Sequence, residues 1–109
     1  ALLPHTVNVV DCDPCGGQDR FVVTAWSDRQ PPVYFLHDSR VEGAASLTLL
    51  GASRPGIEAA RQAAQEFHRI ATRDGQQMPV YVTVPPGKGP WPAVVLVHGG
   101  PWVRGTEWG

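Results

Sequence analysis

Residues 93–102 of the chain have the sequence AVVLVHGGPW. The first five are apolar without interruption, and three of them are β-branched valines. An unbroken apolar run of this length, bounded by glycine and proline, is typical of a strand covered on both faces of a sheet. The sequence therefore predicts a buried strand over Ala93–Val97, with a glycine loop beginning at His98.

The residues before this run predict an antiparallel hairpin. Phe67–Arg73 has the composition of a strand, and Met78–Val84 alternates between apolar and polar positions. Asp74-Gly75 lies between them and favours a type I′ turn, in which both central residues need positive φ. Residues 85–92 contain four prolines and two glycines, which predict a loop before the buried strand.

The first half of the chain predicts small strands separated by turns. Gly and Pro together number 23 (12 and 11), a density that suits short strands better than long helices. Four short strands at this spacing favour a meander or a propeller blade over βαβ units. They are Thr6–Val10, Arg20–Trp26, Val33–His37 and Ser46–Leu50.

One segment favours a helix. Ile57–Glu66 is rich in alanine, the best helix former, but its apolar face is weak because alanine buries little area. The expected fold class of the chain is thus mostly β, with short antiparallel strands plus one short helix. The expected organisation is propeller-like strands over 1–50, a linker and short helix over 51–66, and the start of a second domain over 67–109.

Composition excludes several classes of function. Apolar residues make up 42% of the chain and the formal net charge is −1, so there is no electrostatic case for binding nucleic acid or an anionic membrane. No stretch approaches the roughly 18 to 20 apolar residues of a membrane span. The first residues, ALLP, resemble no signal peptide and lack an initiator Met, and the compartment stays open.

The two cysteines, Cys12 and Cys15, form a C-x-x-C pair. Such a pair can be a redox site, half of a zinc site or a loop disulfide. A zinc site would need two more ligands, and only His5 is near. The glycines after Cys15 indicate a turn and not a helix, so we expect a plain loop whose thiols are either free or bridged, with no cofactor and no metal.

The other polar side chains show no catalytic or ligand spacing. The histidines before residue 98 are expected to be surface or packing residues, and the aspartates around the cysteines a solvated turn that lacks the last Glu of an EF-hand. No G-x-S-x-G is present, so no serine has the setting of an activated nucleophile. The residues concerned are His5, His37 and His68, then Asp11, Asp13 and Asp19, and finally Ser27, Ser39, Ser46 and Ser53.

Several blocks together resemble one family. They are RDG at 73–75, PVYVTVPPG at 79–87, PAVVLVHGGPW at 92–102 and EWG at 107–109, with AWSD at 25–28 and VYFL at 33–36 as weaker markers. In these blocks the chain resembles the prolyl oligopeptidase family of serine peptidases, particularly its acylaminoacyl-peptidase-like members. The similarity is specific over 72–109 and loose before residue 50.

The resemblance implies a fragment that spans the end of a β-propeller and the start of an α/β-hydrolase domain. The parent protein would be a hydrolase that cuts short peptides by acyl transfer, with the propeller acting as a size filter. Gly100 holds the position whose backbone N–H helps form the oxyanion hole, and Gly99 supports that loop. His98 does not match the triad histidine, which would follow much later.

The same resemblance implies that the catalytic triad lies outside these residues, so the chain alone is expected to be inactive. Without the rest of a hydrolase sheet, its apolar strand and strand edges would lead it to self-associate or to pair with the remaining polypeptide. Two alternatives stay open: a non-catalytic β-rich binding or assembly module, and a fragment of an α/β-hydrolase esterase.

Overall fold

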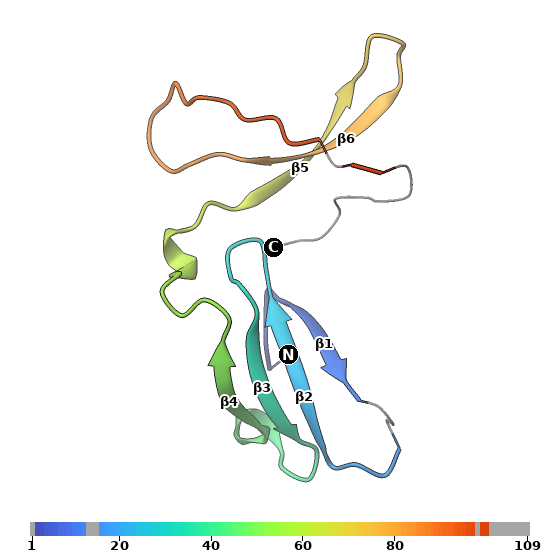
Figure 1. Cartoon of the computed structure of the whole chain (residues 1–109), viewed down its shortest axis with the longest axis vertical. Helices are drawn as coiled ribbons and strands as arrows, with labels where there is room; N and C mark the ends of the chain where they lie inside the picture. The colour runs from blue at the N-terminus through green and yellow to red at the C-terminus, as the bar shows by residue number, and fades with distance from the viewer. Residues whose placement is uncertain (1, 13–15, 98, 101–109) are drawn as a thin grey trace. The chain divides into compact units, whose positions relative to one another are not determined.

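The structure, a computed structural model, describes residues 2–12, 16–97, 99 and 100. The described residues form two compact units, one ending at Ala60 and the other beginning at Arg61. Both are built from antiparallel strands, so the expected mostly-β fold is confirmed (Figure 1). In the described part of the chain, no helix has the length and apolar character needed to cross a membrane.

The first unit is a four-stranded sheet in the order β1-β2-β3-β4. Each strand pairs with the next in sequence, which makes a simple antiparallel meander. All four predicted strands are confirmed to within two residues at each end. Their bounds are β1 Val7–Asp11, β2 Arg20–Trp26, β3 Val33–Asp38 and β4 Leu47–Ala52.

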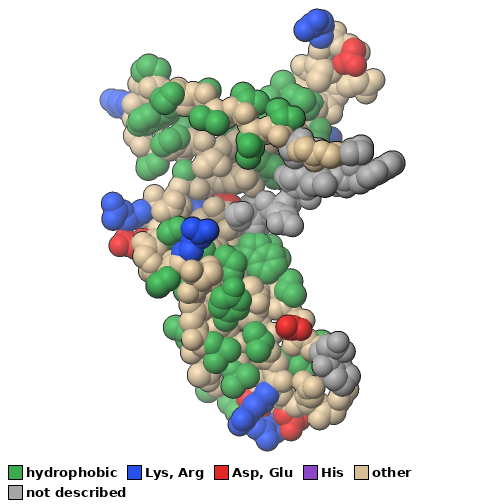
Figure 2. Space-filling model, viewed as in Figure 1, with side chains coloured by type: hydrophobic (Ala, Val, Ile, Leu, Met, Phe, Trp, Pro, Cys, Tyr) green, Lys and Arg blue, Asp and Glu red, His purple; other side chains and the backbone are tan. Residues whose placement is uncertain are grey.

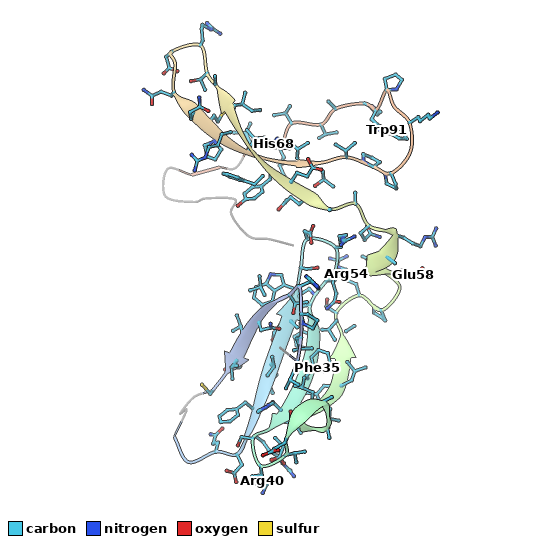
Figure 3. All side chains as sticks on the ribbon, turned by 180° about the vertical axis from the view of Figure 1, so that it is seen from behind. Phe35, Arg40, Arg54, Glu58, His68 and Trp91 are labelled. Carbon is cyan, nitrogen blue, oxygen red and sulfur yellow. The ribbon has the colours of Figure 1, made fainter. Side chains whose placement is uncertain are left out.

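The core of this sheet lies on β2. Val23 is 7% exposed and Ala25 is fully buried, and the two side chains share a face because residues two apart in a strand point the same way. Val23 is in register with Val10 on β1 and with Phe35 on β3 (Figure 3). Val10 on the edge strand β1 is 50% exposed, and β3, which also has two neighbours, has no buried residue, so the buried apolar side chains of this sheet are those of β2.

An ion-pair cluster joins the beginning of β2 to the end of β3. Arg20 and Asp38 are register partners, and the Arg20 Nε lies 3.0 Å from the Asp38 Oδ2. Arg40 donates from its Nε and Nη2 to the two oxygens of the same carboxylate, at 2.9 and 2.7 Å. These guanidinium hydrogen bonds, that of Arg40 first, hold the pKa of Asp38 far below its usual value.

The second unit contains the hairpin of β5 (Gln65–Ala71) and β6 (Gln77–Thr83). On one face, the rings of Phe67 and Tyr81 lie 5.5 Å apart and the guanidinium of Arg69 lies 5.5 Å from the Phe67 ring centre. Aromatic and cation–π contacts of this kind stabilise a cross-strand pair beyond the area they bury. The hairpin expected around Asp74-Gly75 is confirmed.

The turn of this hairpin differs from the expected type I′. Gly75 has φ +82°, whereas Asp74 keeps a negative φ. The Gly75 N–H donates to the Thr72 carbonyl at 3.0 Å and the Thr72 N–H to the Gln76 carbonyl at 2.9 Å. This is a three-residue loop in which one left-handed glycine follows a tight turn. The Asp74 carboxylate accepts from the Thr72 hydroxyl, which lowers the pKa of Asp74.

The helix expected over Ile57–Glu66 is much shorter than predicted. Only Ala59–Arg61 forms a helical turn, of the 3₁₀ type, while Gln65 and Glu66 belong to β5. A second 3₁₀ turn, Gly43–Ser46, precedes β4. None of the side chains in Ala59–Arg61 is buried. Because helices in proteins are stabilised mostly by packing, the helix propensity of alanine alone does not stabilise a longer helix here.

The buried strand expected over Ala93–Val97 is not present. These residues have no regular secondary structure, and the side chains of Val94 and Leu96 are 91% and 94% exposed. A strand that is apolar on both faces needs paired neighbours and a cover on each side. The described residues supply neither, so the run stays extended and open to solvent.

Replacement of Asp38 by Asn should lower the thermal midpoint of the chain, because it removes the acceptor charge shared by Arg20 and Arg40. The loss should depend on pH. A lowered pKa means that Asp38 stabilises the fold fully above its ordinary pKa of 3.8, and that this contribution starts to decrease below that value and is lost only as pH falls through the much lower pKa of the folded state. The difference in thermal midpoint between Asp38→Asn and the wild type should therefore be smaller at pH 3 than at pH 7.

Asp11→Asn is the matched control for this measurement. Asp11 lies exposed on β1 of the same sheet and makes no ion pair with the described residues. Equal losses of stability in Asp11→Asn and Asp38→Asn at pH 7 would contradict a specific role for the cluster.

Candidate functional site

The segment leading to the glycine loop is extended and apolar. It begins at Trp91, whose indole packs against the preceding loop: a Cβ built on Gly87 would lie 3.4 Å from the ring, and one on Gly89 would lie 3.3 Å from the Trp91 backbone (Figure 3). A side chain at Gly89 would therefore be tight against the Trp91 backbone, and at Gly87 the positive φ of +114° favours glycine. A hollow of about 490 Å³ lies between β6 and this segment, with Tyr81 and Val94 among its lining residues.

Exposure of apolar side chains is concentrated on this segment. Four consecutive residues, Val94–Val97, are between 81% and 94% exposed. Large apolar side chains elsewhere in the described residues reach at most 63%, at Leu49. Figure 2 shows apolar side chains at the surface of both units. Soluble monomers seldom expose a contiguous apolar run of this kind.

The two predicted site residues, Gly99 and Gly100, are both exposed and follow this segment directly. Gly100 has φ +79°, in the left-handed region that glycine adopts without a steric penalty. A Cβ at Gly99 would meet no atom of the described residues within 4 Å. Backbone conformation thus explains the glycine at 100.

The remaining members of the predicted loop, His98, Pro101 and Trp102, lie outside the described residues. The role of the Gly100 N–H as an oxyanion donor therefore stays a prediction. What the described residues provide is a left-handed glycine at the end of an apolar segment. In acyl-transfer enzymes, such bends aim backbone N–H groups at a developing negative charge.

The serines that lack a nucleophile setting have structural roles. The Ser27 hydroxyl accepts from the backbone N–H groups of Arg29 and Gln30, at 3.2 and 3.1 Å. Ser39 donates to the Asp19 carbonyl and Ser46 to the Gly43 carbonyl. These hydroxyls stabilise turns.

The histidines are spread over three separate places. His5 lies in the turn before β1 with φ +61°, and His37 lies on β3 in register with Phe21. His68 faces Glu66 on β5, with 3.0 Å between Nε2 and Oε2. In the part of the chain that the structure describes, no three His, Cys, Asp or Glu side chains gather to hold a metal ion.

Cys12 is disulfide-bonded. The chain has one other cysteine, Cys15, which is outside the described residues. Of the alternatives left open by the sequence, the bridged loop thus applies to Cys12, and a zinc thiolate at this position is excluded in the bonded state.

Sequence reasoning missed the cluster around Asp38. Arg20 and Asp38 are 18 residues apart, and only the register of two strands brings them together. The available signal was that Arg20 opens one predicted strand and Asp38 follows the next. In an antiparallel hairpin these two ends are neighbours.

Comparison with known proteins relates the chain to a peptidase. The chain is 36% identical over 96 residues to dipeptidyl aminopeptidase BIII of Pseudoxanthomonas mexicana. The match covers 79% of this chain and 14% of that protein, so the chain spans about one-seventh of the length of its relative. No family model and no solved structure matches the chain. The similarity relates the chain to a peptidase, and hence to a hydrolase.

Proposed function

We propose that this chain is the part of a serine peptidase of the prolyl oligopeptidase family that joins the end of a β-propeller to the start of an α/β-hydrolase domain. The observation that carries the proposal is the 36% identity to a dipeptidyl aminopeptidase. The four-stranded meander fits a propeller blade, and the β5–β6 hairpin followed by an apolar run fits the opening of a hydrolase sheet.

In this proposal the chain contributes electrostatic stabilisation and not the nucleophile. The Gly100 N–H donates to the negative oxygen of the tetrahedral intermediate, and Gly99 allows the loop to approach it. Removal of one such donor from an acyl-transfer enzyme typically slows turnover by about 10²–10³-fold. The serine, the carboxylate and the histidine come from sequence that these residues do not contain.

The 109-residue chain by itself should hydrolyse neither dipeptidyl p-nitroanilides nor p-nitrophenyl esters, because it contains no G-x-S-x-G. A chromogenic assay at micromolar protein concentration tests this. Turnover that a serine-reactive phosphonate abolishes would overturn the assignment of catalysis to other residues.

A longer polypeptide containing this chain should release dipeptides, and Gly100→Ala should lower its kcat about 100-fold with little change in KM. Alanine disfavours φ +79° and so turns the N–H away from the oxyanion. Gly75→Ala is the matched control: it strains an equally left-handed glycine, φ +82°, in the β5–β6 turn and should leave kcat unchanged. Equal effects in the two variants, or cleavage of esters without peptides, would contradict the proposal.

The exposed run Val94–Val97 favours a second role, as an assembly surface for another copy of the chain. The run carries no charge, so two copies can pair there without repulsion, and an extended apolar segment adds readily to another strand. Light scattering should therefore give the isolated chain a molar mass above that of a monomer, rising with concentration.

Val95→Lys should return the chain to a monomer, because a charge in each copy would then be buried against its equivalent. Val41→Lys, at an exposed loop position of the first unit, is the control and should leave the mass unchanged. A monomeric wild type at all concentrations would rule out this role.

A further inference from the structure

A polar groove lies at the end of the first sheet where β1 begins and β2 ends. Val7 and Trp26 are register partners. Thr6, which precedes β1, and Ser27, which follows β2, therefore leave the sheet side by side. The cavity formed there is about 400 Å³ in volume. Its lining includes His5 and Thr6 from the first turn, Asp28 and Arg29 from the β2–β3 loop, and Ala59 and Ala60 from the 3₁₀ turn.

The β2–β3 loop holds Arg29 on a rigid backbone. Ser27, 7% exposed, donates from its N–H to the Gln30 carbonyl at 2.9 Å. Its hydroxyl accepts from the N–H groups of both Arg29 and Gln30. Three hydrogen bonds thus fix a four-residue turn, which lowers the entropy lost when the Arg29 side chain binds a ligand.

The opposite wall is also fixed by hydrogen bonds. The Thr6 hydroxyl donates to the Leu3 carbonyl at 3.0 Å, and the Asn8 side-chain amide donates to the Thr6 carbonyl at 3.2 Å. Within this turn His5 adopts φ +61°, the one positive φ of a non-glycine residue in the described part of the chain. The Thr6 hydroxyl proton is thus already engaged, and the Arg29 guanidinium is a permanently charged donor on the lining.

Arg29 differs from the other arginines of the sheet. Arg20 and Arg40 are both engaged by the Asp38 carboxylate. Arg29 is exposed, and among the described residues it has no ion-pair partner. An arginine on a fixed turn that lines a cavity suits bidentate binding of a planar anion.

We propose that this groove binds the carboxylate of a small ligand or peptide, with Arg29 as the anchoring cation. The guanidinium donates one hydrogen bond to each of the two carboxylate oxygens. The volume of the cavity admits the one or two residues next to the carboxylate. This site is independent of the acyl-transfer proposal, because none of its residues belongs to the glycine loop.

The test is a titration of the ¹⁵N-labelled 109-residue chain followed by amide chemical shifts. Acetyl-Ala-Ala should cause saturable shifts at His5, Arg29 and Gln30, and acetyl-Ala-Ala-amide should cause none. The carboxylate can come from the C-terminus of a peptide or from a side chain. Acetyl-Glu-amide carries its carboxylate on the side chain, so shifts at the same residues would mean that both kinds of carboxylate are accepted. Failure of the acid and the amide to differ would overturn the proposal.

Arg29→Gln should weaken acetyl-Ala-Ala binding about tenfold or more, the usual effect of losing a charge-assisted hydrogen bond. Since Arg29 is exposed, the spectrum of the free variant should keep its dispersion, which separates loss of binding from loss of fold. Arg73→Gln is the matched control, an exposed arginine without an ion pair in the β5–β6 turn. Unchanged affinity in Arg29→Gln, or equal losses in both variants, would contradict the assignment.

Discussion

The two-sided pairing of β2 is the constraint on which the first unit depends. Its register with β1 aligns Val7 with Trp26, and its register with β3 aligns Arg20 with Asp38. The first alignment opens the groove at one end of the sheet, and the second brings together the ion pairs at the other end. The groove and the ion pairs thus depend on the same register of β2. A slip by one residue would remove both alignments and would also move Val23 to the opposite face of the sheet.

The strands were predictable because their signals are local. Each has β-branched or aromatic residues between turn formers, and the predicted bounds of Arg20–Trp26 match β2 at both ends. The details of turns were less predictable. Asp74-Gly75 correctly indicated a hairpin, but the backbone pairing of Thr72 with Gln76 makes a three-residue loop with one left-handed residue in place of two. Dipeptide preference alone does not fix the length of the loop.

The two wrong predictions, the helix over Ile57–Glu66 and the strand over Ala93–Val97, have a common origin. Alanine propensity and an unbroken apolar run both describe what a segment does once other elements cover it. In the described residues nothing covers either one, so only Ala59–Arg61 forms a helical turn and the apolar run stays extended. The backbone conformation of the predicted site residue Gly100 depends less on burial by other elements. Gly100 was predicted from its motif, and its left-handed conformation is a property of its own backbone.

That difference between local and non-local structure determines what the glycine loop can do. A positive φ at Gly100 needs no partner strand, because the absence of a Cβ is sufficient. The direction of its N–H, in contrast, depends on how the run before it is held, and a strand fixed in a sheet holds its end more firmly than an exposed segment. An oxyanion donor acts through preorganisation, since a group that must reorient during the reaction loses much of its effect. In the proposed role of Gly100 as an oxyanion donor, burial of Val94–Val97 would therefore be the physical condition for an effective donor.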